Sequence, residues 1–308
     1  MKAITGYLQQ YVRSLNWLST LGITLLTAIL ITLNYTVGIE QRCMSIDHYG
    51  LRFLAFFGVF VFVYGAAWLI QYATHRKTFN ASPFFWFLIL AAPAIFAGKV
   101  SFDWITRLFT NHLPFPWHQY GYLVLNWPLK CLLVLGFITL IWKWGKYKEP
   151  VAGMSIKGFD AKPYFILLLM MVPLIVFAST QADFLRTYPK VHRIDFIEPF
   201  VQQTWGYKLV YELSYGIDFL TIETFFRGFL ILAFARYAGK HAILPMAAFY
   251  CAIHFGKPLL ECITSYFGGM ILGVVVYHTR SIWGGLIVHL GIAWLMEAGG
   301  AIGHAYMK

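Results

Sequence analysis

Residues 53–73 read FLAFFGVFVFVYGAAWLIQYA, an apolar stretch without a charged side chain. A helix needs about 20 mostly apolar residues to cross the hydrocarbon core of a bilayer, and this stretch has that length and composition. Over its 308 residues the chain is 59% hydrophobic and only 12% charged, with a mean hydropathy of +0.63. Similar stretches occur at Trp17–Ile39, Phe84–Gly98, Tyr122–Trp142, Tyr164–Ala182, Leu209–Arg236, Leu244–Phe255, Leu259–Tyr277 and Ile282–Ile302. The sequence therefore predicts an all-α, polytopic membrane helix bundle of eight or nine spans.

The formal charge of +11 is explained by membrane topology rather than by nucleic-acid binding. Lysine and arginine concentrate in cytoplasmic loops of membrane proteins, and here they gather mainly in alternate loops. With the N-terminus inside, the basic groups at 76–77, 143–162, 236–240 and 280 fall on the cytoplasmic side. We expect a multi-pass protein of a bacterial cytoplasmic membrane, with the lipid bilayer and no nucleic acid among its partners.

The two halves of the chain differ in character. A polar, basic loop over 143–162 is the best candidate boundary, and it predicts N-terminal transmembrane helices in 1–150 and a C-terminal transmembrane core in 151–308. Ionisable side chains within hydrophobic stretches concentrate in the last hundred residues. Because such groups are costly inside a membrane, each is a candidate functional residue. We expect any chemistry to lie at about 205–302.

The stretch TIETFFRGFL, residues 221–230, carries the first candidate pair. Glu223 and Arg227 are four positions apart, so on a helix they share a face and can pair. The pair alone is equally compatible with a structural ion pair and with a role in catalysis, since a buried ion pair is weak evidence for stability.

A second group lies in FYCAIHFGKPLLE, residues 249–261. Here His254 comes near the end of a helix that Gly256 and Pro258 stop, and Glu261 opens the next helix. Interrupted backbone at membrane depth requires protein or a watery cavity to satisfy its polar groups. A cavity beside His254 is therefore expected, although a membrane histidine is more often a packing or hydrogen-bonding residue.

The third group is SIWGGLIVHLGIAWLMEAGG, residues 281–300, with His289 and, two turns further on, Glu297. A carboxylate and two histidines from separate helices can activate water directly or through zinc. The same residues are compatible with the proton relay of a transporter. A G-x-x-x-G at Gly269 and Gly273 predicts close helix packing there.

Taken in order, Glu-x-x-x-Arg-Gly, aromatic-x-x-x-His and a later His resemble the CPBP family of intramembrane proteases, which includes CAAX prenyl endoproteases and the bacterial Abi or bacteriocin-processing proteins. The similarity covers roughly 205–300. It departs from the family in two motifs: Ile222 stands where a first glutamate is usual, and Ala293 stands where an asparagine is frequent. Tyr250 keeps the aromatic position of the second motif.

In the family the first glutamate and the second-motif histidine are thought to activate water, while the later histidine and its asparagine stabilise the oxyanion. The resemblance thus implies that His254 and His289 contact the substrate, with the carboxylate coming from Glu223, Glu261 or Glu297. We prefer Glu261 or Glu297 as the general base, because Glu223 has Arg227 at helical spacing and the other two lack an obvious cationic partner. A divalent metal such as zinc, with His254 and His289 as candidate ligands, is compatible but not required, since no HExxH pair occurs.

These features predict an intramembrane endopeptidase that hydrolyses a peptide bond of a membrane-associated peptide or protein with water activated by a carboxylate and a histidine. The alternative is a non-catalytic member of the family that binds a peptide or a partner protein, as the two departures allow. A transporter ranks third.

Overall fold

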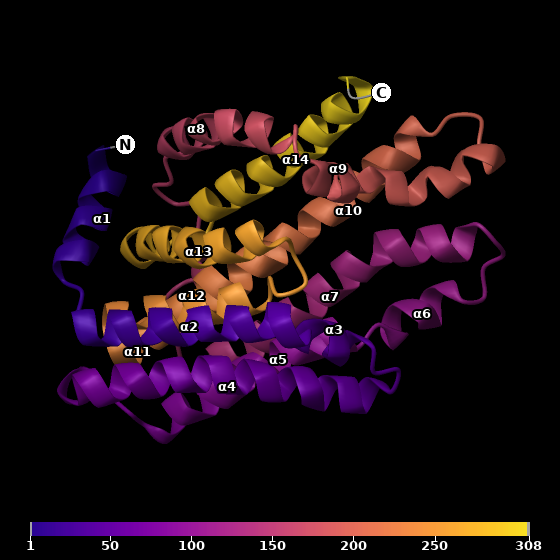
Figure 1. Cartoon of the computed structure of the whole chain (residues 1–308). Helices are drawn as coiled ribbons and strands as arrows, with labels where there is room; N and C mark the ends of the chain where they lie inside the picture. The colour runs from indigo at the N-terminus through magenta and orange to yellow at the C-terminus, as the bar shows by residue number, and fades with distance from the viewer. Residues whose placement is uncertain (1, 307–308) are drawn as a thin grey trace. The chain divides into compact units, whose positions relative to one another are not determined.

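The computed structural model describes residues 2–306, and within that range it contains helices and no strand (Figure 1). The longer helices are α2 (Trp17–Val37), α4 (Tyr49–His75), α5 (Pro83–Ser101), α7 (Trp117–Trp144), α8 (Lys162–Ala178), α10 (Trp205–Ile222), α13 (Leu259–Thr279) and α14 (Trp283–Tyr306). The shorter ones are α1 (Lys2–Arg13), α3 (Ile39–Met44), α6 (Trp104–Thr110), α9 (Ala182–Thr187), α11 (Phe234–Ala238) and α12 (Ile243–Ala252). Four 3-10 segments, η1 (Arg76–Thr78), η2 (Val151–Gly153), η3 (Lys190–Phe200) and η5 (Gly239–Ala242), and one π-helix, η4 (Glu223–Ala233), complete the chain.

The expected polytopic helical fold is confirmed, although the number of spans is not. Six stretches in residues 2–306 are long and apolar enough to cross a membrane: Trp17–Val37, Tyr49–Thr78, Pro83–Thr110, Trp117–Trp144, Leu259–Thr279 and Trp283–Tyr306. The other three expected spans are α8, with 17 residues, the α10–η4–α11 run, and α12, with 10 residues. At 1.5 Å per residue α12 is about 15 Å long, half of the hydrocarbon thickness. All ten of its residues are buried, as expected for a helix that is apolar on every side and lies in a protein core.

The described residues form two compact units. The first comprises 2–102, 136–155 and 224–282, and at its centre α12 packs against α2, α4 and α13 (Figure 1). Methyl groups at Gly269 and Gly273 of α13 would come within 2.9 Å of Tyr250 and 2.8 Å of Met246, respectively. The close helix approach predicted from G-x-x-x-G is therefore confirmed, and α12 is the partner.

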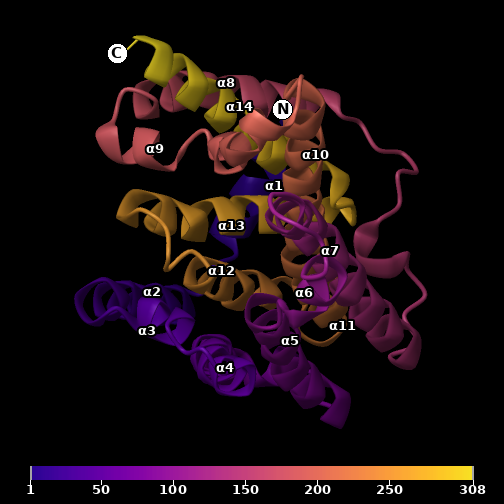
Figure 2. The same cartoon turned by 90° about the vertical axis from the view of Figure 1, so that its right-hand side faces the viewer.

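The second unit comprises 103–135, 156–223 and 283–306. Helix α14 packs along α8, as both views show (Figures 1 and 2), and also contacts α9 and α10. A cluster of Val124, Ile194, Ile197 and Tyr211 forms a buried core between η3, α7 and α10. This unit contains Glu223, which directly follows α10, and His289 on α14.

The loop expected over 143–162 is present, because α7 ends at Trp144 and α8 begins at Lys162. The chain passes between the two units at five points, after 102, 135, 155, 223 and 282. These units are defined by packing, whereas the proposed division into 1–150 and 151–308 was drawn from sequence character and stays a prediction.

Candidate active site

The first motif begins at the junction between α10 and a π-helix. Glu223 is the first residue of η4, which runs for 11 residues to Ala233. The sequence pattern predicted an ordinary α-helix here, because apolar periodicity cannot distinguish the two. A π-helix widens the turn to i→i+5 hydrogen bonds, is rare, and occurs mostly at functional sites. The unusual backbone starts at the acidic residue that the sequence singled out.

In the second unit the carboxylate of Glu223 is paired with His289. The two atoms Oε1 of Glu223 and Nδ1 of His289 are 3.0 Å apart. Glu223 is fully buried, whereas 19% of the His289 side chain is exposed. A carboxylate only accepts, so Nδ1 carries the proton and donates, and in the neutral ring Nε2 keeps its lone pair. The carboxylate thereby sets the tautomer and the orientation of the imidazole.

Two neighbours hold this pair in place. The ring of Phe219, one turn before Glu223 on α10, meets the His289 ring edge to face with centroids 4.7 Å apart. On α14, Gly285 lies one turn before His289, and a methyl group there would collide with Oε2 of Glu223. Gly285, which belongs to the third motif, thus leaves the space that the carboxylate of Glu223 in the first motif occupies.

In the first unit the arginine of motif one contacts the aromatic residue of motif two. The guanidinium carbon of Arg227 lies 3.9 Å from the centroid of the Tyr250 ring. Both side chains are buried, with 1% and 4% of their surface exposed. A desolvated cation over an aromatic face is strongly attracted to the ring, so this contact fixes η4 against α12.

His254 comes one turn after Tyr250 in the chain. Helix α12 ends at Ala252, His254 lies in the following turn, and α13 begins at Leu259, which confirms the expected helix break. Nδ1 of His254 donates to the carbonyl oxygen of Tyr250 at 2.8 Å, and the two rings lie 4.6 Å apart. As in His289, Nδ1 is the donor, so Nε2 is the nitrogen that accepts a proton or binds a metal.

The turn that carries His254 is held by residues that the sequence did not reveal. The buried amide of Asn34 donates to the carbonyl oxygen of Phe255 at 2.9 Å and accepts from the backbone nitrogen of Glu40 at 3.0 Å. The half-buried carboxylate of Glu40 lies against Gly256, where a methyl group would come within 2.8 Å of it. Burial raises the pKa of Glu40. Nothing in the sequence links 34–40 to 254–256, because only folding brings the end of α2 to this turn.

The remaining two carboxylates have partners. Glu261 lies 3.4 Å from the ammonium of Lys257, four residues before it, so the expectation that it lacks a cation at helical spacing is wrong. The oxygens of Glu297 accept from the backbone nitrogens of Lys190 and Val191 at 2.9 and 3.2 Å, respectively. Glu297 thus caps the start of η3, a structural task that the sequence did not indicate.

The structure therefore groups the candidates within each unit. Glu223 and His289 are bonded in the second unit, with Glu297 engaged elsewhere on α14. Arg227 and His254 are connected through Tyr250 in the first unit, next to the ion pair of Glu261. The pairing of Glu223 with Arg227, and the meeting of both histidines at one reaction centre, stay predictions. No group of three or more His, Cys, Asp or Glu side chains in residues 2–306 is placed to hold a metal ion.

The fold and these histidine sites define the chain as a multi-pass helical membrane protein. Comparison with family models matches residues 209–295 to a family described as type II CAAX prenyl endopeptidase Rce1-like. No curated protein and no solved structure matches the chain. The matched region contains the motif residues from Glu223 to Ala293, and it supports the resemblance to the CPBP family of intramembrane proteases that these motifs indicated.

Proposed function

We propose that the protein is an intramembrane endopeptidase that hydrolyses a peptide bond of a membrane-associated protein, in a bacterial cytoplasmic membrane. The hydrogen bond between Glu223 and His289 carries the proposal. A buried carboxylate that orients an imidazole is the arrangement by which hydrolases prepare a histidine for catalysis. The family match supports the reaction class.

The two histidines would take different roles because their partners differ. Nδ1 of His254 donates to a neutral carbonyl, so His254 is the better general base through Nε2. His289 is held by a carboxylate, which stabilises the positive charge of an imidazolium. A protonated His289 can donate a hydrogen bond from Nε2 to an oxyanion. It would do so alone, because Ala293 has no side-chain amide that could donate as well.

In the proposed reaction Nε2 of His254 takes a proton from water while the water oxygen bonds to the scissile carbonyl carbon. The carbonyl oxygen becomes an oxyanion that accepts a hydrogen bond from His289. When the C–N bond breaks, the protonated His254 transfers its proton to the leaving amine. Glu223 remains ionised and keeps His289 oriented throughout.

The name of the matched family suggests a substrate with a prenylated C-terminus. The test uses the full-length protein in proteoliposomes with a fluorogenic peptide bearing a farnesylated cysteine near its C-terminus, and the same peptide without the lipid. We expect cleavage of the lipidated peptide by the wild type and none by His254→Ala or His289→Ala at equal expression. Cleavage by either variant at the wild-type rate would contradict the assignment.

A non-catalytic role in binding a peptide or partner protein is the second candidate. It is favoured by the two departures from the family motifs, since Ile222 and Ala293 are both buried and apolar. This alternative predicts that the lipidated peptide binds to the wild type, and to both histidine variants, without being cleaved.

A further inference from the structure

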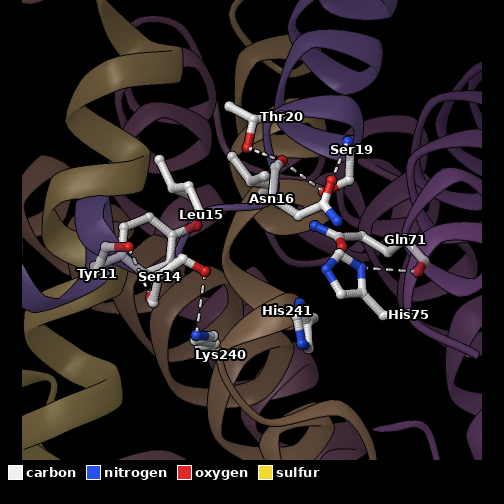
Figure 3. Close-up of a pocket in the computed structure, with 11 residues that line it drawn as sticks. Tyr11, Ser14, Leu15, Asn16, Ser19, Thr20, Gln71, His75, Lys240 and His241 are labelled. Atoms are coloured by element: carbon white, nitrogen blue, oxygen red, sulfur yellow. Dashed lines mark hydrogen bonds between the residues drawn. The ribbon is translucent and has the colours of Figure 1, made fainter. Parts of the chain in front are cut away.

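A separate polar pocket lies where α2 begins (Figure 3). It is formed by the first turn of α2 around Asn16, by the end of α4 with Gln71 and His75, and by Lys240 and His241 of η5. Asn34, which holds the His254 turn, is 18 residues further along α2, about 27 Å at 1.5 Å per residue. The pocket is therefore distinct from the candidate active site, and all its residues belong to the first unit.

Positive charge in the pocket comes from the side chain of Lys240 and from the start of α2. The rings of His75 and His241 lie with centroids 4.0 Å apart, and the ammonium of Lys240 donates to the carbonyl of Ser14 at 3.3 Å, which leaves it two further protons to donate. The N-terminus of α2, capped by Asn16, adds the positive end of a 21-residue helix dipole. None of the lining residues is acidic.

The pKa of His241 is lowered to about 4, first by burial and then by its neighbours His75 and Lys240. A bound anion would offset these effects and favour the protonated ring. The ionisable groups that act on His241 are His75 from α4 and Lys240 from η5, and Tyr11 of α1 also lines the pocket.

One side chain indicates that a ligand also donates a hydrogen bond. Gln71 is only 2% exposed, and its Oε1 has no hydrogen-bond partner among residues 2–306. Its amide extends toward Asn16 and His75 in the pocket (Figure 3). Buried polar atoms in folded proteins are almost always satisfied, so an orphan acceptor calls for a donor from outside the chain.

The position of the pocket identifies the source of the ligand. It lies at the end of two candidate spans, which begin at Trp17 and end at Thr78, the level at which lipid head groups occur. Next to it on α2, the side chains of Trp17, Leu18 and Leu21 are 72%, 72% and 67% exposed, respectively. These apolar side chains offer a surface for acyl chains beside a cationic pocket, and basic pockets between transmembrane helices bind anionic head groups.

We infer that this pocket binds the head group of an anionic, hydroxyl-bearing phospholipid such as phosphatidylglycerol. Its phosphate oxygens lie beside Lys240, His241 and the start of α2, and a head-group hydroxyl donates to Oε1 of Gln71. The acyl chains run along the exposed face of α2. This role does not depend on the proposed peptidase activity.

The test measures lipid binding to the full-length protein in detergent by native mass spectrometry and by the shift of the unfolding temperature. The probes are dioleoylphosphatidylglycerol, dioleoylphosphatidylcholine and inorganic phosphate. We expect phosphatidylglycerol to bind more tightly than phosphatidylcholine and to raise the unfolding temperature of the protein more. Both differences should become smaller as the salt concentration rises. Lys240→Gln should lower the affinity for phosphatidylglycerol about fivefold.

The matched control is Lys77→Gln, which removes one exposed cation at the same end of α4 without altering the pocket lining. It should leave the affinity unchanged. For the wild type, binding should tighten between pH 7 and pH 5 as the anion draws a proton onto His241, and His241→Gln should flatten this dependence. Gln71→Met should weaken the binding of phosphatidylglycerol and leave the binding of phosphatidylcholine unchanged.

Three results would overturn the inference: equal affinity of the wild type for the two lipids, equal losses in Lys240→Gln and Lys77→Gln, or stabilisation by inorganic phosphate that matches the lipid. The last would assign the pocket to a free anion. The comparison of the two lipids uses only the wild type, so it decides the matter even if the Lys240 variant does not fold.

Discussion

Gly285 leaves the space that the carboxylate of Glu223 occupies, and a methyl group on its Cα would collide with Oε2 of that carboxylate. The residue that bonds Glu223 is His289, one turn further along the same helix. Helix α14 thus supplies both the partner of the carboxylate and the room for it. Gly285, one turn before His289, is therefore part of the candidate site and not only a packing residue.

Gly285→Ala should therefore separate Glu223 from His289. We expect a loss of about 1–3 kcal/mol in stability from overpacking together with loss of peptidase activity, measured by thermal unfolding in detergent and by peptide cleavage. Gly206→Ala is the control, because a methyl group on that α10 glycine meets nothing within 4 Å. Equal behaviour of the two variants would contradict the crowding at Gly285.

Glu223→Gln keeps an oxygen that can accept from His289 but removes the charge. In the proposed mechanism this leaves the imidazolium without its counter-ion, so kcat should fall by a factor on the order of 10²–10⁴. Replacing Glu198, whose side chain is 52% exposed, by glutamine is the control. A Glu223→Gln variant with wild-type kcat would mean that the carboxylate has no catalytic part.

The contact of Arg227 with Tyr250 predicts an order of stability. Tyr250→Phe keeps an aromatic face under the guanidinium, whereas Tyr250→Leu removes it and should cost about 2 kcal/mol more. Arg227→Lys keeps the charge but loses the planar group that stacks on the ring, so it should also be destabilising. Unfolding temperatures in detergent measure the series, and similar values for the Phe and Leu variants would refute the contribution of the ring.

Asn34 should act on the reaction through the turn that carries His254. Asn34→Leu leaves the carbonyl of Phe255 and the amide of Glu40 without this partner, at a cost of about 1–3 kcal/mol each if they stay buried. Because His254 would then be misplaced, kcat should fall more than KM rises. Thr32→Ala, an exposed position on the same helix, should have neither effect, and an equal kcat for both variants would exclude the positioning role.

The acid stability of the second unit should depend on Asp195 of η3. Burial opposes its charge, but hydrogen bonds from His192 and Lys208 outweigh burial and lower the pKa of Asp195 below 3.8. A carboxyl whose folded pKa is lowered stabilises the protein above its unfolded pKa and loses that contribution as the pH falls through the folded pKa. Asp195→Asn should thus lower the unfolding temperature at pH 7, and this decrease should become smaller as the pH falls from 7 to 3. The same decrease at both pH values would contradict this linkage.

Much of the architecture followed from the sequence. Stretches of about 20 apolar residues predict helices because a bilayer leaves no other way to satisfy the backbone, and Gly256 with Pro258 predicted the break after His254. Of the three expected spans that failed the count, α12 is enclosed by protein, whereas α8 and α10 keep exposed apolar side chains. For α12, composition alone does not distinguish burial in a bilayer from burial in a core.

The hydrogen-bond and ion-pair partners of the candidate residues were harder to predict from the sequence. Helical spacing pointed from Glu223 to Arg227, four residues away, but the bond that the structure shows joins Glu223 to His289, 66 residues away. Glu297 was a candidate general base from the sequence, and the structure shows that its carboxylate accepts hydrogen bonds at the start of η3. Spacing along one helix is visible in a sequence, whereas contacts between helices depend on their rotation and approach.

The sequence by itself determined the helical membrane fold, the resemblance to an intramembrane protease family and the candidate residues, because hydrophobicity and local spacing are properties of the chain. The tertiary structure alone decided the hydrogen bonds of His254 and His289, the partners of each candidate carboxylate and the polar pocket at the start of α2. Hydrogen bonds and burial are set by which surfaces meet, and that choice is made only when the helices pack.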